Sequence, residues 1–131
     1  DWTDTPAGSL ALLILLDQFP RNAFRGTAHM YATDALARYF AHRAQSTGHM
    51  DAIDAELRLF FCLPFAHSED EGDQDLSVQL NARLGQPWLD HAEGHRDIIR
   101  RFGRFPHRNR LLGRETTPQE RAFLDQGGFA G

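Results

Sequence analysis

An unbroken apolar run at residues 10–16 constrains the fold of this chain more than any other feature. A helix made from this run has no polar face, so we expect it to be buried on all sides. The run is far shorter than the roughly 20 apolar residues that cross a bilayer, which predicts a core helix and no membrane partner. Pro6 suits the first turn of this helix, and Pro20 is expected to end it in a turn.

Four polar side chains follow this run closely: Asp17, Arg21, Asn22 and Arg25. A negative charge in the last turn of a helix opposes the helix dipole, and a buried carboxylate is costly unless it is paired. The guanidinium groups of Arg21 and Arg25 can supply that pairing through two parallel hydrogen bonds. Two interpretations are open here. The group is either a structural ion pair that braces the turn, or a site in which one guanidinium faces a ligand.

Helical signals continue through the rest of the chain. We expect helices over residues 27–44, 51–64, 68–85 and 87–103, and a short last helix from Thr117, each bounded by a cap, a glycine or a proline. No segment alternates in the manner of paired strands. The chain is therefore predicted to be all-α, a single helical domain over residues 1–131. It should contain about five to six helices, with turns at Pro20, Pro64 and Pro106.

Apolar residues at helical spacing predict which helix faces are buried. In the helix over residues 27–44 the expected inner face comprises Ala32, Leu36, Tyr39 and Phe40. The apolar stripe of the helix over residues 87–103 is interrupted by His95. A buried histidine requires a polar partner, so we expect one to reach His95 from another part of the chain.

Composition excludes several classes of function. A net charge of −4 lacks the positive surplus that a general nucleic-acid binder needs. The stretch over residues 96–114 holds seven arginines and one acid, Asp97, but it lacks interleaved exposed aromatic residues. We therefore expect no nucleic-acid partner. The single cysteine, Cys62, excludes an internal disulfide and favours a reducing compartment, which predicts a cytoplasmic location and a buried thiol.

Sequence motifs predict neither a cofactor nor a metal. The chain has no nucleotide-binding loop, nucleophile elbow or redox cysteine pair. His91 and His95 are spaced like two metal ligands on one helix face. However, a zinc-protease motif needs glutamate directly after the first histidine, where this chain has Ala92, and no third ligand lies nearby.

Polar residues in three separate turns form the candidate binding site. They are Asp17, Arg21, Asn22 and Arg25 in the first turn, His67 and Glu69 in the second, and His95 with Arg108 and Asn109 in the third. If the helices are antiparallel neighbours, alternate turns gather at one end of the domain. Such a site would suit a peptide or a small acidic ligand carrying a carboxylate or phosphate. Two alternatives remain: a small enzyme that uses a His–Glu acid–base pair, and residues that each brace their own turn.

Three longer phrases resemble one known family. They are Leu-Asp-Gln-Phe-Pro-Arg-Asn-Ala-Phe-Arg-Gly at residues 16–26, Leu-Pro-Phe-Ala-His-Ser-Glu-Asp at 63–70 and Phe-Gly-Arg-Phe-Pro-His-Arg-Asn at 102–109. In this order they are similar to the bacterial family known as domain of unknown function 924. The resemblance implies an all-α fold of the tetratricopeptide-like superfamily, built of antiparallel helix pairs. It implies no activity.

The chain departs from that family at its start. Family members usually carry a further segment before the Leu-Asp-Gln phrase, and this segment is absent here, since the chain begins almost at that phrase. Either the start is missing or the helix layer is one pair shorter. The apolar helix over residues 10–16 would then lack part of its cover. Because large exposed apolar patches mark interfaces, we expect a homo-oligomer.

Overall fold

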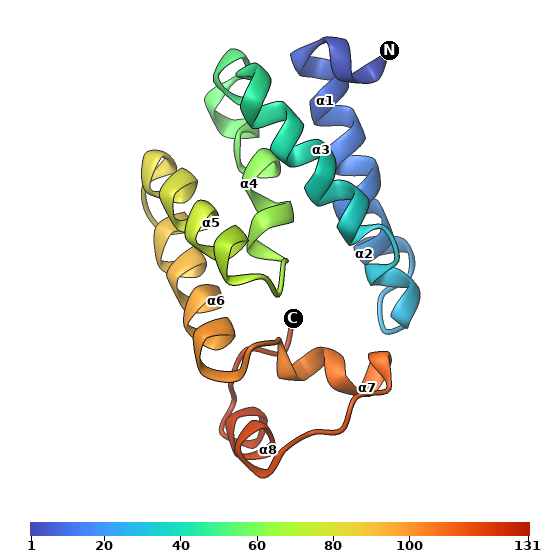
Figure 1. Cartoon of the computed structure of the whole chain (residues 1–131), viewed down its shortest axis with the longest axis vertical. Coiled ribbons are helices and arrows are strands. Elements are labelled where there is room, and N and C mark those ends of the chain that lie inside the picture. The colour runs from blue at the N-terminus through green and yellow to red at the C-terminus, as the bar shows by residue number, and fades with distance from the viewer.

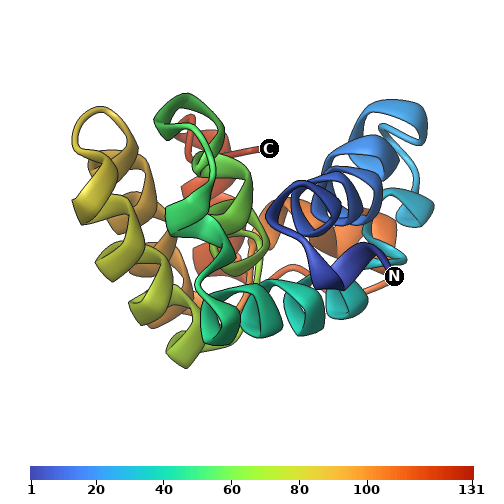
Figure 2. The same cartoon turned by 90° about the horizontal axis from the view of Figure 1, so that it is seen from above.

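Helices make up the whole fold, as predicted. The computed structural model describes all 131 residues and contains no strand. Five helices form the main body, and each runs antiparallel to the next (Figures 1 and 2). They are α1 (Pro6–Leu13), α3 (Asp34–Thr47), α4 (Leu59–Ala66), α5 (Glu71–Leu84) and α6 (Trp88–Phe102). None of these helices is long and apolar enough to cross a membrane.

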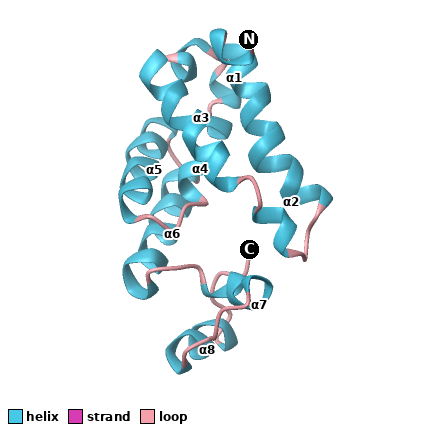
Figure 3. Cartoon of the chain, turned by 45° about the vertical axis from the view of Figure 1, so that its right-hand side comes forward, coloured by secondary structure: helices cyan, strands magenta, loops and turns pink.

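The first helix does not end at Pro20, so the turn predicted there is wrong. A π-helical turn, Ile14–Gln18, joins α1 directly to α2 (Phe19–Ala23), and together they form one long rod (Figure 3). Pro20 lies in the first turn of α2. A proline is tolerated there because its missing N–H would have no intrahelical partner once the preceding turn widens.

The apolar run is only partly buried. Leu13 is inaccessible, but Ile14 and Leu15 keep 37% and 45% of their surface exposed. The prediction of burial on all sides is therefore wrong. The rod lies at the edge of the helical layer and contacts α3 and α4, so one side of the run has no neighbour in the chain.

The buried face of α3 also differs from the prediction. Leu36 and Tyr39 are 47% and 58% exposed, whereas Ala37, Ala41 and Ala44 are buried. The predicted helix began at residue 27, but a short 3-10 turn (Ala28–Tyr31) precedes α3. The small alanine side chains allow α3 to approach α1 and α4 closely, which the larger residues of the predicted face would prevent.

The region before α4 was also predicted incorrectly. Two 3-10 turns, His49–Ala52 and Ala55–Leu57, replace the expected helix start, and Pro64 lies inside α4 rather than ending it. α5 is capped by Asp70, which accepts the amide of Asp73, and not by Ser68. The helical segments therefore outnumber the five to six expected, because several predicted helices are divided into shorter pieces.

Two apolar clusters hold the fold together. The larger one joins α1, α3, α4 and α5 around Leu13, Phe61 and Phe65, and it includes the buried thiol of Cys62. Burial raises the pKa of this thiol to about 12, so it stays protonated and unreactive. The smaller cluster joins α6 to the C-terminal part through Ile98, Ile99 and Phe105.

The C-terminal part forms a corner at one end of the main body (Figure 1). It comprises a 3-10 turn (Pro106–Arg108), α7 (Asn109–Leu112) and α8 (Pro118–Asp125). α8 begins with the predicted capping box, in which the side chains of Thr117 and Glu120 each accept the backbone amide of the other. The last residues then return toward the main body, and Phe129 packs against His95.

Candidate functional site

The centre of the site is a buried pair formed by Asp17 and His67. Asp17 lies in the π-helical turn, where its side chain is 1% exposed. Its Oδ1 is 2.8 Å from His67 Nδ1 and also accepts from the guanidinium of Arg21 at 3.2 Å. Its Oδ2 accepts from the side-chain amide of Gln18 at 2.7 Å. Both carboxylate oxygens are therefore satisfied, and π-helical turns of this kind often coincide with functional sites.

The protonation state of this pair follows from its partners. Burial raises the pKa of Asp17, but the adjacent His67 and Arg21 outweigh it and the net pKa is lowered. Asp17 is therefore ionised and can only accept hydrogen bonds. His67 then donates from Nδ1, and its Nε2 is the ring nitrogen that no group of the chain occupies.

Arg21 connects this pair to α3. Its two terminal nitrogens donate to both oxygens of Asp34 at 2.8 and 2.9 Å, a bidentate arrangement. Arg108 of the C-terminal corner lies 4.0 Å from the same carboxylate. The guanidinium of Arg108 also lies over the ring of Tyr31, at 4.6 Å from the ring centre. The network therefore joins α2, α3, α4 and the corner.

The position of His67 is fixed by the way α4 ends. The backbone carbonyl of His67 accepts from Arg108 at 2.7 Å. The fully buried amide of Gln74 donates to the carbonyls of Ala66 and Ser68, on either side of His67, at 2.9 and 2.7 Å. These bonds satisfy carbonyls that the helix end leaves open, and they hold the imidazole against the cavity.

A cavity of about 470 Å³ lies beside this network. Besides Tyr31, its charged and titratable lining consists of four arginines and three histidines, with no aspartate or glutamate. These residues are Arg21, Arg25, Arg108, Arg110, His67, His95 and His107. The volume lies within the range of roughly 300–1,000 Å³ that is common for small-molecule sites.

Three buried nitrogen atoms of this lining have no hydrogen-bond partner. They are Nε of Arg108 and the Nδ1 atoms of His95 and His107. Burial, followed by nearby positive groups, lowers the pKa of both histidines to about 4, so both are neutral near pH 7. Arg108 is only 7% exposed, and an unsatisfied buried donor of this kind calls for an explanation.

The rim of the cavity carries cations without carboxylate partners. Arg25 and Arg110 are exposed, and neither side chain makes an ion pair or hydrogen bond within the chain. Asn22 also lines the cavity, while its amide donates to the carbonyl of Gln18. These exposed groups can meet a ligand without first breaking an internal ion pair.

Glu69 and Asn109 belong to a different network, within the C-terminal corner. Glu69 accepts a bidentate pair of bonds from Arg114 at 2.8 and 3.1 Å and the amide of Phe105 at 2.6 Å. Burial raises the pKa of Glu69, but these bonds outweigh it and lower the net value. Asn109 accepts from Arg114 at 3.0 Å and donates toward Glu120 at 3.4 Å. Both residues brace the corner, and neither lines the cavity.

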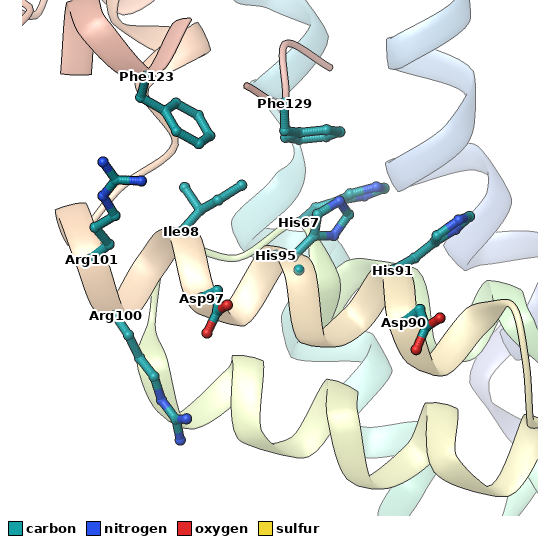
Figure 4. A pocket seen from close by; sticks show the side chains of 11 residues that line it. His67, Asp90, His91, His95, Asp97, Ile98, Arg100, Arg101, Phe123 and Phe129 are labelled. Carbon is teal, nitrogen blue, oxygen red and sulfur yellow. The ribbon is translucent and has the colours of Figure 1, made fainter. Parts of the chain in front are cut away.

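An open groove of about 1,050 Å³ adjoins the cavity along α6. Its lining shares His67, His95 and Phe129 with the cavity. Figure 4 shows the imidazoles of His67 and His95 below the ring of Phe129. The ring centres of His95 and Phe129 are 4.6 Å apart, and Phe129 therefore forms part of the wall between the two spaces.

Sequence reasoning missed several members of both networks. Asp34, His107, Arg110 and Arg114 were not included in the candidate site. The bidentate partner of Glu69 could not be inferred from spacing, because Arg114 lies 45 residues away. No group of three potential ligands that could hold a metal is present, so His91 and His95 have no third partner.

The fold and the cavity define an all-helical protein with a site lined by arginine and histidine. The chain belongs to the family described as bacterial protein of unknown function (DUF924), whose model matches residues 1–128. This confirms the family that the three phrases predicted.

A solved structure of a protein of unknown function from Agrobacterium tumefaciens is similar to this chain. The two share 60% sequence identity and a TM-score of 0.94, over 96% of this chain and 72% of that chain. The curated proteins include no match. Neither similarity names an activity, so function must be argued from the site.

Proposed function

We propose that this protein binds a small anionic compound, bearing a carboxylate or phosphate group, in the cavity beside Asp17 and His67. The observation that carries the proposal is the charge of the lining: four arginines and three histidines face a space with no acidic side chain. Buried cations are normally paired, because removing an unpaired charge from water costs roughly several kcal/mol of free energy. An anion would supply a partner for Arg25 and Arg110, which make no ion pair, and for the unmet Nε of Arg108.

Arg108 is the best-placed group to contact that anion. Its side chain is nearly inaccessible, and its Nε has no partner. Its other contacts are to a backbone carbonyl, to aromatic rings and, at 4.0 Å, to Asp34. The nearest carboxylate, Asp34, is already bonded to both terminal nitrogens of Arg21. Arg108 therefore retains hydrogen-bonding capacity, and guanidinium groups suit planar carboxylates and phosphates.

The ligand could equally be free or part of a peptide, because either source presents the same anionic group. The tetratricopeptide-like arrangement inferred from the family would favour a peptide, and the antiparallel helix neighbours are consistent with that arrangement. A cytoplasmic location remains part of this proposal, supported by the single buried cysteine.

A His–Glu acid–base pair receives no support from the geometry. Glu69 is held by Arg114 and by the amide of Phe105, and His67 is bonded to Asp17 instead. Acid–base chemistry at this site would have to use another pair.

Thermal shift followed by calorimetry tests the proposal with inorganic phosphate, succinate and citrate. We expect at least one anion to raise the melting temperature saturably, because a ligand that binds only the folded state stabilises it. Replacing both Arg25 and Arg110 with glutamine should weaken binding about tenfold or more, since charge-assisted hydrogen bonds contribute roughly 1.5–3 kcal/mol. Arg43→Gln, an exposed arginine outside the cavity, provides the matched control.

Failure would be clear in this design. If none of the three anions binds saturably, or if the Arg25 and Arg110 double variant binds as tightly as the Arg43→Gln control, the cavity is not an anion site.

A further inference from the structure

Asp17 and His67 have the geometry of an acid–base pair, and this pair is separate from the groups that would hold an anion. Ionised Asp17 accepts from Nδ1 of His67 at 2.8 Å, so Nε2 is the ring nitrogen that can exchange a proton with a reactant. No intramolecular hydrogen bond to Nε2 is present, while the His67 ring lines both the cavity and the open groove. An imidazole oriented through one nitrogen and free at the other is suited to general-base work.

The surroundings of this pair limit the chemistry it could do. Neither the cavity nor the groove is lined by serine, threonine, cysteine or lysine. The buried Cys62 lies in the core and its raised pKa keeps it protonated. A covalent intermediate on a serine, threonine, cysteine or lysine is therefore unsupported, and we take water as the nucleophile.

The two spaces that meet at His67 suggest how the reactants are arranged. The cavity offers arginine to an anion, and the groove along α6 is the more open of the two spaces. Water can thus reach Nε2 from the groove while an anionic compound is held on the other side. Arg108 is bonded through its terminal nitrogen to the His67 carbonyl, so its unpartnered Nε lies on the same wall as the imidazole.

We propose that His67, oriented by Asp17, acts as the general base in the hydrolysis of a carboxylic ester that bears a second, anionic group. The inference rests on the proposed anion site, which would position the ester. His67 Nε2 takes a proton from water as the water oxygen bonds to the ester carbonyl carbon. The carbonyl becomes an oxyanion, for which the Arg108 guanidinium is the donor we assign, because it lines the cavity and its Nε has no partner.

The second half of the reaction returns the proton. The oxyanion collapses, the bond between the carbonyl carbon and the leaving oxygen breaks, and protonated His67 donates to that oxygen. One ester and one water give one carboxylic acid and one alcohol, so no cofactor or redox partner is required. Asp17 touches no reactant and serves as a positioning residue, which holds the imidazole and stabilises its cationic form.

The experiment follows cleavage of 4-acetoxybenzoate and of its uncharged analogue, methyl 4-acetoxybenzoate, by absorbance. We expect cleavage of the anionic ester to saturate and to exceed that of the neutral ester. His67→Gln should lower kcat by a factor of about 10²–10⁴, the usual contribution of a general base, with KM changed by less than about threefold. Asp17→Asn should also lower kcat and displace the pH profile, because asparagine no longer fixes the tautomer.

The chain contains a matched control. His42 Nε2 lies 3.0 Å from Asp73 Oδ1, which is also an Asp–His pair, but it is 53% exposed and lines neither space. His42→Gln should therefore leave cleavage unchanged. Circular dichroism establishes that each variant is folded, and His67→Gln decides the question if Asp17→Asn does not fold.

The possible results separate this inference from the anion site. The wild-type protein could bind the anion saturably and yet cleave the ester no faster than His67→Gln does. That result would leave the anion site supported and would overturn the hydrolytic role. Equal losses in His42→Gln and His67→Gln would also overturn it, since they would indicate unspecific reaction of surface imidazoles. Absence of anion binding would overturn both proposals.

Discussion

Mild acid should destabilise this protein through His95 and His107, before its carboxylates titrate. Both imidazoles are buried, and burial is the main reason that each has a pKa of about 4 instead of 6.5. The charged and titratable groups that act on their pKa values are mostly arginines and histidines, with one acid. These groups are His67, His91, Arg21, Arg108, Arg114 and Glu69. A positive charge on either ring is therefore disfavoured by burial and by the positive charge of Arg108.

The sign and size of the effect follow from proton linkage. Between pH 6.5 and 4 each histidine is protonated in the unfolded chain but neutral in the folded one, so unfolding takes up protons and stability falls as the pH falls. For a pKa of about 4 folded and 6.5 unfolded, the loss at pH 5 relative to pH 8 is about 2 kcal/mol for each histidine. Asp17 and Glu69 have lowered pKa values, so the stability they contribute is lost only at more acidic pH.

Urea unfolding at pH 8, 7, 6 and 5 measures this dependence directly. His95→Gln and His107→Gln should each flatten the curve of unfolding free energy against pH by about 2 kcal/mol over that range. His29→Gln, at an exposed position, should leave the slope unchanged. The burial of neutral imidazoles is refuted if the wild-type protein has the same free energy of unfolding at pH 8 and pH 5. It is also refuted if the curves of His95→Gln and His107→Gln run parallel to the wild-type curve.

Two further predictions concern stability and assembly. Glu120→Gln should lower the free energy of unfolding by about 1–3 kcal/mol in a urea titration, since Glu120 is 2% exposed and accepts two hydrogen bonds from Arg104. Glu115→Gln, at an exposed position, should change that free energy by less than about 0.5 kcal/mol. Equal effects of the two substitutions would contradict the bracing role of Glu120. Because Ile14 and Leu15 are exposed, we expect a homo-oligomer, and Leu15→Arg should convert it to a monomer. If light scattering shows that the wild-type protein is a monomer at high concentration, this expectation is wrong.

The helical content and the family could be predicted from the sequence, because periodicity and caps are local signals. The capping box at Thr117 illustrates this, since both of its hydrogen bonds join residues three positions apart. The continuation of the first helix through Pro20 could not be predicted. Whether a proline ends a helix depends on the hydrogen-bond register before it, and here a π-helical turn changes that register.

The candidate site could be predicted only in part, for a similar reason. Asp17 was singled out correctly as a carboxylate that needs partners, and its cost in a buried position follows from elementary electrostatics. Its histidine partner, however, lies 50 residues away. Glu69 and His67 are neighbours in sequence, yet their side chains belong to different networks, because the chain turns between α4 and α5 and directs them apart.

The two networks differ in a way that bears on function. In the corner, Glu69, Glu120 and Asn109 meet arginine at nearly ideal distances, and their side-chain oxygens and nitrogens have partners. A network that only braces a fold has no reason to leave buried donors unmet, because each would cost about 1–3 kcal/mol. Beside the cavity, Arg108, His95 and His107 each retain an unmet nitrogen, while Thr3, Gln74 and Arg96 retain unmet atoms elsewhere. Bracing accounts for the corner network. Beside the cavity, three unmet nitrogens coincide with a lining of arginines without an acidic side chain, and this coincidence favours a ligand there.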